Sequence, residues 1–221
     1  MELLEKIISE KPAFHQAGAE LRRAGPSGDL KCYGIAAEVL RFLADVVTPE
    51  SKSLETGAGC STLMFAIKGA THTAVTPAPN EIERIRAYCR DEHIDLSKVS
   101  FVAQPSELYL PASQESGLDV VLIDGKHAFP WPILDWFFTA DKLKRGGYML
   151  LDDAQMRAVS VLADFMMVEP SWKMVRDFSG KTIVFQKLVD VALDVGWKAQ
   201  PWNTDSQKKH IAGLLSRLGL R

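Results

Sequence analysis

The sequence predicts an α/β fold with a mostly parallel sheet between two layers of helices. From Ser53 onward, short apolar runs alternate with segments of helical periodicity, a pattern typical of βαβ units packed on a parallel sheet. Two β-rich runs, 172–178 and 181–187, are separated only by Ser179-Gly180 and therefore predict a hairpin. A Gly-x-Gly turn follows the first apolar run, at residues 57–59. Together these observations predict a three-layer sandwich whose seven-stranded sheet ends in an antiparallel hairpin.

Each expected element follows from the spacing of its apolar residues. A helix at 33–47 has one buried stripe, which includes Ile35, Val39 and Leu43. The strands expected before the hairpin are 52–56, 72–76, 99–103, 118–123 and 147–152. The helices expected between and after them are 60–68, 80–92, 131–143 and about 155–167, with a short helical turn after Gln104. Right-handed crossovers place the carboxyl ends of parallel strands on one edge of the sheet, where such sheets bind ligands.

Helical segments are expected at both termini of this α/β region. Residues 1–32 form an N-terminal helical segment, with one or two amphipathic helices that Pro12 interrupts. Residues 33–187 form the α/β domain, because no linker or low-complexity tract divides them. Residues 188–221 form a C-terminal extension, in which a basic amphipathic helix is expected from Asp205 to Leu220.

Composition and charge favour a cytoplasmic protein with a small-molecule partner. The chain has 26 Lys and Arg against 28 Asp and Glu, without a long block of either sign. We therefore expect no nucleic-acid partner and no membrane partner. No leader pattern is present, and no run approaches the roughly 18 apolar residues that span a bilayer. The cysteines, which are few and widely spaced, are expected to be buried free thiols: Cys32, Cys60 and Cys89.

Residues 53–62, Ser-Leu-Glu-Thr-Gly-Ala-Gly-Cys-Ser-Thr, are typical of a parallel sheet's first strand and its turn toward an adenosine-type cofactor. Gly57 and Gly59 permit a sharp turn and a close approach to a ligand because they lack a Cβ. Glu55 can accept hydrogen bonds from hydroxyl or ammonium groups. A dinucleotide site would have a third glycine where Thr62 stands, so a nucleoside without phosphate is favoured. The alternative is a purely structural tight turn.

Three blocks of the chain resemble the class I S-adenosylmethionine-dependent methyltransferases, over about residues 33–187. They are Leu54-Glu-Thr-Gly-Ala-Gly-Cys-Ser-Thr62, Asp119-Val-Val-Leu-Ile-Asp-Gly-Lys-His127 and Leu143-Lys-Arg-Gly-Gly-Tyr-Met-Leu-Leu-Asp-Asp153. The last two look like the branch of that family that includes many small-molecule O-methyltransferases. The resemblance implies a Rossmann-like fold, S-adenosylmethionine as cofactor, and methyl transfer to a small-molecule acceptor.

The resemblance also implies which residues hold this cofactor. Family members bind the ribose hydroxyls with an acid at the end of the second strand, but here that strand reads Thr73-Ala-Val-Thr-Pro-Ala-Pro79. Thr76 offers a hydroxyl instead, and Glu81 could reach back from the next helix. Ser106 belongs to the loop that the resemblance places over the adenine. The full set is Glu55, Gly57, Gly59, Ser61, Thr62, Thr76, Ser106, Asp124 and Gly125.

Acidic residues end the fourth and fifth strands and are expected at the same edge as the glycine turn. Three carboxylates in one cleft repel one another unless a cation or hydrogen-bond donors intervene, and oxygen ligands suit Mg²⁺, Ca²⁺ or Mn²⁺. Metal-dependent members of the family use acids at matching strand ends, so the resemblance makes Asp124, Asp152 and Asp153 candidate metal ligands. The alternative is that these acids cap helices and bind loop amides.

His127, three residues after Asp124, is the candidate general base because an ordinary imidazole is largely neutral at pH 7. Lys126 is a second candidate. The other histidines have no comparable neighbours in the sequence: His15, His72, His93 and His210. We therefore expect His127 and Asp124 to be the catalytic residues.

The identity of the acceptor is not specified by the sequence. The loop Ala128-Phe-Pro-Trp-Pro132 could form an apolar wall for it, with Trp131 as a contact. Two other functions stay open. One is a non-catalytic nucleoside-binding scaffold, which the absent ribose acid supports. The other is a nicotinamide-dependent oxidoreductase, against which the absent third glycine argues. A homo-oligomer is also possible, since the C-terminal helix could pack on another subunit.

Overall fold

The chain folds as a mostly parallel sheet between two layers of helices, which confirms the predicted fold class. The computed structural model describes residues 2–12, 14, 34–193 and 196–204. Within them, seven strands lie in the order β3-β2-β1-β4-β5-β7-β6, and all except β7 run in one direction. The strand bounds are β1 (Lys52–Thr56), β2 (Thr71–Val75), β3 (Val99–Val102), β4 (Leu118–Ile123), β5 (Leu143–Leu151), β6 (Trp172–Phe178) and β7 (Thr182–Lys187).

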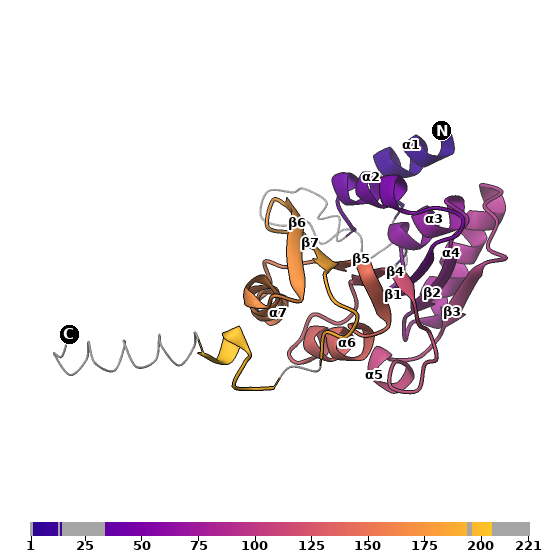
Figure 1. The fold of residues 1–221 in the computed structure, drawn as a ribbon. Helices are drawn as coiled ribbons and strands as arrows, with labels where there is room; N and C mark the ends of the chain where they lie inside the picture. Colours follow the sequence, from indigo (N-terminus) through magenta and orange to yellow (C-terminus); the bar gives the residue numbers. More distant parts are fainter. Residues whose placement is uncertain (1, 13, 15–33, 194–195, 205–221) are drawn as a thin grey trace, which may run out of the picture.

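Helices cover both faces of the sheet (Figure 1). The alternation of side chains along β4 shows how the faces divide, because Val120 and Leu122 join one core while Val121 and Ile123 join the other. The first core packs against α1 (Glu2–Glu10), α2 (Ala37–Val46), α3 (Cys60–Ile67) and α4 (Pro79–Asp91). The second packs against α5 (Ser106–Tyr109), α6 (Trp131–Thr139) and α7 (Arg157–Val168).

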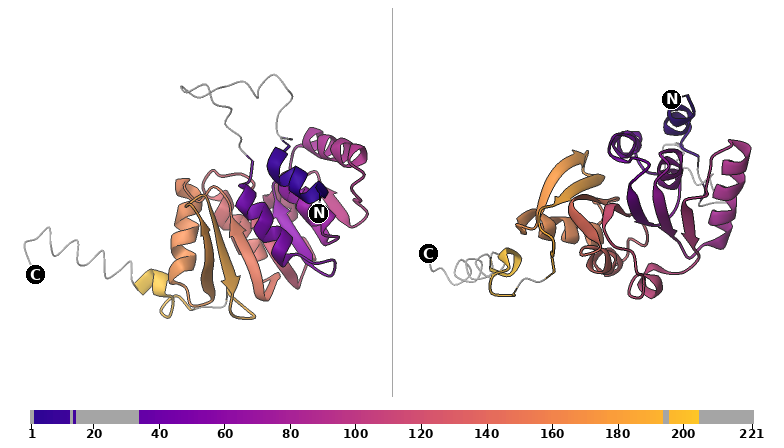
Figure 2. Two further views of the ribbon diagram at one scale, coloured as in Figure 1. Left: turned by 90° about the horizontal axis from the view of Figure 1, so that it is seen from above. Right: turned by 45° about the vertical axis from the view of Figure 1, so that its right-hand side comes forward.

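The C-terminal hairpin enters the sheet with its second strand inside. β7 pairs antiparallel with both β5 and β6, so β6 forms the edge of the sheet beside α7 (Figure 2). Residues 182–185 of β7 are all buried, whereas β6 exposes Lys173, Arg176 and Asp177. The sequence predicted an antiparallel edge. The structure confirms this prediction: β6, the more polar strand of the hairpin, forms the edge, where its charged side chains discourage pairing with another chain.

The start of β5 departs from the prediction by four residues. This strand begins at Leu143, four residues before the expected 147, and α6 ends at Thr139 rather than 143. Gly146 (φ +84°) and Gly147 lie inside the strand, beside a register shift in the pairing of β4 with β5. A Cβ at Gly147 would lie 2.8 Å from a side-chain atom of Leu143. The Gly-Gly pair is therefore a bulge within the strand and not a turn before it.

Some predictions fall outside the described residues. These are the helix from Asp205 to Leu220, the second half of the N-terminal segment, and Cys32. The division of the chain into three parts therefore stays a prediction. Cys60 and Cys89 are buried and neither forms a disulfide, as expected. In the part of the chain that the structure describes, no helix has the length and apolar character needed to cross a membrane.

Candidate cofactor and acceptor site

The glycine turn joins β1 to α3 at the carboxyl edge of the sheet. Gly57 has φ +91°, in the left-handed region, and its N–H donates to the carbonyl oxygen of Val75 (2.9 Å). A Cβ at position 57 would lie 2.4 Å from the carbonyl oxygen of Asp124. Glycine is therefore required here both by the backbone conformation and by the close contact between the loops after β1 and β4.

Glu55 does not face the ligand side of this turn. Its side chain is 1% exposed, and its carboxylate accepts hydrogen bonds from the hydroxyls of Ser61 and Thr62. Thr62 Oγ1 also accepts the N–H of Gly59 (2.9 Å). The sequence predicted that these four residues contact the cofactor. In the structure they form an internal network that fixes the turn, because Glu55 points to the face of the sheet on which α3 packs.

His72 is the residue of this network that the sequence reasoning missed. Its Nε2 lies 3.2 Å from Oε1 of Glu55, its Nδ1 lies 2.9 Å from Ser53 Oγ, and its ring stacks on Phe65 of α3. His72 has no acidic neighbour in sequence, and its partners come from β1 through strand pairing. The alternation of residues on paired β1 and β2 was the only sequence signal that could have found this contact.

A pocket of about 510 Å³ opens at the carboxyl edge of the sheet. Its lining comes from the carboxyl ends of β1 to β5 and the segments that follow them, as expected for a sheet of this topology. Five of the predicted cofactor-binding residues line it: Gly57, Thr76, Ser106, Asp124 and Gly125. The volume lies within the range of about 300–1,000 Å³ that is usual for small-molecule sites.

Glu81 brings an acid to the position that lacks one at the end of β2. Thr76 Oγ1 donates a hydrogen bond to Oε2 of Glu81 (2.8 Å), and both residues are buried and line the pocket. Helix α4 starts at Pro79, whose fixed φ suits the first turn of a helix, so Glu81 lies in that turn and faces back toward β2. A carboxylate is also favoured at a helix N-terminus by the helix dipole.

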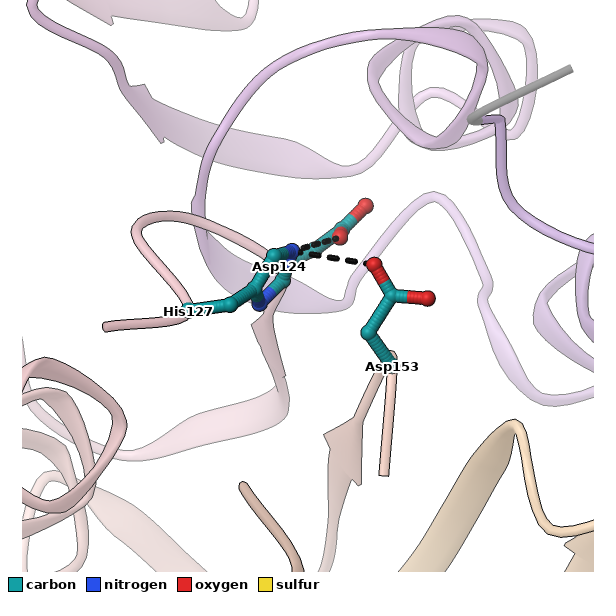
Figure 3. A group of neighbouring side chains, drawn as sticks. All are labelled: Asp124, His127 and Asp153. Atoms are coloured by element: carbon teal, nitrogen blue, oxygen red, sulfur yellow. Dashed lines mark ion pairs between the residues drawn. The ribbon is translucent and has the colours of Figure 1, made fainter. Parts of the chain in front are cut away.

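Asp124, His127 and Asp153 converge in the same pocket (Figure 3). His127 Nε2 lies 3.1 Å from Asp153 Oδ2 and 3.7 Å from Asp124 Oδ1, and the possible ligand atoms of the three residues lie within 4.8 Å of one another. Asp153 has φ +53°, which aspartate tolerates better than most residues and which turns its side chain into the pocket. The side chains of all three are partly exposed, so a ligand can reach them.

Asp152 does not belong to this group, although its carboxylate lies near that of Asp124. Its side chain is buried, accepts a hydrogen bond from the hydroxyl of Thr182, and lies 3.9 Å from Nζ of Lys181. Lys181 in turn donates to the carbonyl oxygen of Gly34 (2.9 Å). Two of the three predicted metal ligands, Asp124 and Asp153, therefore lie together, and His127 completes the group in place of Asp152.

The acids give the site a negative potential. Burial is the main cause that raises the pKa of Asp124 well above its usual range, and the nearby carboxylates of Asp152, Glu55 and Asp153 raise it further. Burial also raises the pKa of Asp152, which Thr182 and Lys181 partly oppose. Such a site favours a proton, a metal cation or the positive centre of a ligand.

Lys126 has a different environment from His127. Its Nζ lies 3.6 Å from the centre of the Trp131 ring, which is a cation–π contact. The contact engages the ammonium group away from the two carboxylates, so His127 is the better placed of the two candidate bases.

Residues 54–154 match the family model of a methyltransferase domain. This segment includes the glycine turn, Asp124, His127 and Asp153. These residues form a methyltransferase domain. No curated protein sequence matches this methyltransferase.

Solved structures share the fold of the methyltransferase at low sequence identity. A protein from Staphylococcus aureus described as a caffeoyl-CoA O-methyltransferase is 13% identical, with a TM-score of 0.61, and the match covers 84% of this chain and 97% of that one. The SAH-bound methyltransferase PaMTH1 from Podospora anserina is also 13% identical, with a TM-score of 0.61, covering 86% and 89%. An rRNA methylase from Streptococcus thermophilus is 15% identical, with a TM-score of 0.53, covering 69% and 96%. These similarities show a shared fold.

Proposed function

We propose that this methyltransferase transfers a methyl group to a hydroxyl oxygen of a small molecule. The observation that carries the proposal is the convergence of Asp124, His127 and Asp153 in the pocket formed at the glycine turn. A histidine held by carboxylates is suited to remove the proton of a hydroxyl group. The likeness in fold to a protein described as an O-methyltransferase supports the same reaction.

The residues of the pocket fit S-adenosylmethionine. Gly57 brings the backbone of the turn to the pocket wall, and the paired side chains of Thr76 and Glu81 suit the two ribose hydroxyls. The carboxylates of Asp124 and Asp153 favour the positive sulfonium. Ser106 and Gly125 line the remaining wall, where the adenine would lie.

The proton of the acceptor would pass to His127. When Nε2–H donates to Asp153, the lone pair of the neutral ring is on Nδ1, which can take this proton. S-adenosylmethionine supplies an activated methyl group, whose bond to sulfur breaks as the acceptor oxygen bonds to the methyl carbon. The remaining work of the protein is to align the two reactants and exclude water.

Exposed apolar side chains in the segments that form the pocket support an acceptor with an apolar part. Leu108 and Phe129 are each 67% exposed, and each lies next to or near a residue that lines the pocket, Glu107 and His127 respectively. Trp131 continues this loop and contacts Lys126. We therefore propose aromatic or otherwise apolar hydroxyl compounds as the acceptor class.

A divalent cation fits the group of Asp124, His127 and Asp153 by donor type, since two carboxylates and an imidazole suit Mg²⁺ or Mn²⁺. Bound there, it would orient the acceptor hydroxyl and lower its pKa.

Because the pKa of Asp124 is raised, protons compete with the cation, and the affinity for Mn²⁺ should increase from pH 6 to pH 8. Calorimetric titration at the two pH values measures this. The absence of Mg²⁺ and Mn²⁺ binding at millimolar concentration would leave proton removal to His127 alone.

The experiment that tests the function combines binding and turnover. Calorimetry with S-adenosylmethionine and S-adenosylhomocysteine should show binding of both, and a panel of phenols and aliphatic alcohols should contain an acceptor that is methylated on oxygen. Binding of the cofactor with methylation of RNA alone would refute the small-molecule acceptor. Binding without transfer to any substrate would favour a nucleoside-binding scaffold. Failure of both nucleosides to bind would refute the cofactor site.

Replacing Glu81 with glutamine should weaken binding of S-adenosylhomocysteine about 10- to 100-fold. The carboxylate is expected to accept hydrogen bonds from the ribose, and a hydrogen bond to a charged group contributes on the order of 1.5–3 kcal/mol. The matched control is Glu83→Gln, which changes an exposed acid on the same helix and should leave the affinity unchanged. Equal affinities of the wild type and Glu81→Gln would place the ribose elsewhere.

A further inference from the structure

His72 is a fully buried histidine that the proposed reaction does not use. Its side chain has no exposed surface, and it lies on β2, which pairs with β1 on one side and with β3 on the other. Burying a ring with two polar nitrogens costs free energy unless each nitrogen has a partner. Both have one, because Nδ1 lies 2.9 Å from Ser53 Oγ and Nε2 lies 3.2 Å from Glu55 Oε1. A polar network thus occupies a position that packing alone would fill with an apolar residue.

The directions of the hydrogen bonds in this network follow from Glu55. An ionised carboxylate can only accept, so Nε2 of His72 and the hydroxyls of Ser61 and Thr62 all donate to it. The hydroxyl of Thr62 has a single proton, which it donates to the carboxylate, so its lone pairs are free to accept. One of them accepts the N–H of Gly59 (2.9 Å). We call this series, from His72 through Glu55 and Thr62 to Gly59, the hydrogen-bond relay.

The relay ends next to the wall of the pocket. Residues 56–58 line the pocket, and His72 does not. The hydrogen bond that Gly59 donates to Thr62 lies between this wall and α3, which begins at Cys60. A turn that is fixed before a ligand arrives loses little conformational entropy on binding, and a loosened turn loses more. The affinity of the pocket for its cofactor therefore depends on hydrogen bonds that the ligand does not touch.

We infer that His72 is a positioning residue of the cofactor site, an inference that rests on the proposed function. Its Nε2–H holds the carboxylate of Glu55 in the direction in which Thr62 can donate to it and still accept from Gly59. Without this proton, the buried carboxylate loses one of its three side-chain donors and no longer fixes the hydroxyl of Thr62. The stacking of the ring on Phe65 accounts for packing alone, since an apolar aromatic side chain would stack as well.

The test compares His72→Gln with His72→Met, whose side chains are similar in length and shape. Both variants lose the stacking on Phe65 and the contact with Ser53, but the glutamine amide can still donate to Glu55. In calorimetry, S-adenosylhomocysteine should bind about tenfold more weakly to His72→Met, the effect of one hydrogen bond to a charged group, and within about threefold of the wild type to His72→Gln. Thr62→Val should weaken binding as much as His72→Met, and the double variant should bind no more weakly, because both changes break the same relay.

Hydrogen exchange separates positioning from a general loss of stability. Exchange in the peptide of residues 57–62 should be faster in His72→Met than in His72→Gln, while exchange in β7, outside the relay, should be the same in both. The control is Leu162→Ala, which removes a buried side chain from the other core. It should lower the melting temperature and leave the affinity for S-adenosylhomocysteine unchanged.

Wild-type affinity in folded His72→Met would overturn the inference and leave the ring a packing role. Equal affinities of the two variants, or equal exchange at residues 57–62, would also overturn it, because the donated hydrogen bond would then not be the cause. Should His72→Met not fold, Thr62→Val decides, since it breaks the relay at the turn and keeps the histidine; wild-type affinity there overturns the inference. Wild-type protein that does not bind S-adenosylhomocysteine would refute the cofactor site itself, and the inference with it.

Discussion

Replacing His127 with glutamine is expected to lower kcat for methyl transfer about 10²- to 10⁴-fold, the usual contribution of a general base. Glutamine is close in size to histidine and can still donate to Asp153, which lies 3.1 Å from the imidazole, but it cannot accept a proton from the acceptor. The affinity for S-adenosylhomocysteine should stay within about twofold of the wild-type value, because the side chain acts on the acceptor. Steady-state kinetics and calorimetry on the same preparation measure the two effects.

The control for this variant is His93→Asn. His93 is exposed after α4 and has φ +56°, a left-handed conformation that asparagine tolerates, so kcat should not change. Retention of the wild-type kcat by His127→Gln would assign the proton to another group. A variant that recovers activity with added Mn²⁺ would show that His127 acts as a metal ligand and not as the base.

Lys187→Met should destabilise the fold by about 3–5 kcal/mol, the cost of removing one partner from a buried charged network. Lys187 lies on β7 with no exposed surface, and its ammonium donates to the carbonyl oxygens of Ala140 (2.7 Å), Leu143 (2.8 Å) and Asp190 (3.0 Å). Methionine fills the same space but leaves three carbonyl groups without a donor. Burial lowers the pKa of Lys187, and Asp141 opposes this effect.

Denaturant unfolding of the wild type and the variant measures this loss. Lys144→Met is the control, because Lys144 is half exposed and pairs with Asp119 at the surface, where an ion pair contributes less than about 1 kcal/mol. The activity per folded molecule should be the same in both variants, since neither lysine lines the pocket. A loss below about 1 kcal/mol for Lys187→Met would mean that the three carbonyl groups find other donors.

The sequence predicted the elements because their signals are local. The apolar runs of β1 and β4 gave the observed bounds, since a strand's alternation and its flanking turns are contiguous in the chain. The predicted start of β5 was wrong because the sequence signal there is also local. Gly146-Gly147 has the local signature of a turn, and only the pairing with β4 shows that it is a bulge.

Some of the candidate site residues lie at the pocket, as the sequence predicted, and others do not. Residues that follow a strand directly, such as Gly57 and Asp124, line the pocket, because parallel strands share a carboxyl edge. Glu55 was assigned to the cofactor, but it points into the core toward α3. His72 carried no local sequence signal, since its partners Ser53 and Glu55 lie on the neighbouring strand.

By itself, then, the sequence determined the fold class, the edge of the sheet that carries the site, and the group of residues from which the site is drawn. The tertiary structure alone decided which of these side chains face the pocket. Asp152 and Asp153 are adjacent in the chain, yet one is bound by Thr182 in the core and the other faces His127. The physical reason is that a side chain's direction depends on one backbone dihedral and on partners from distant strands, neither of which residue type and spacing specify.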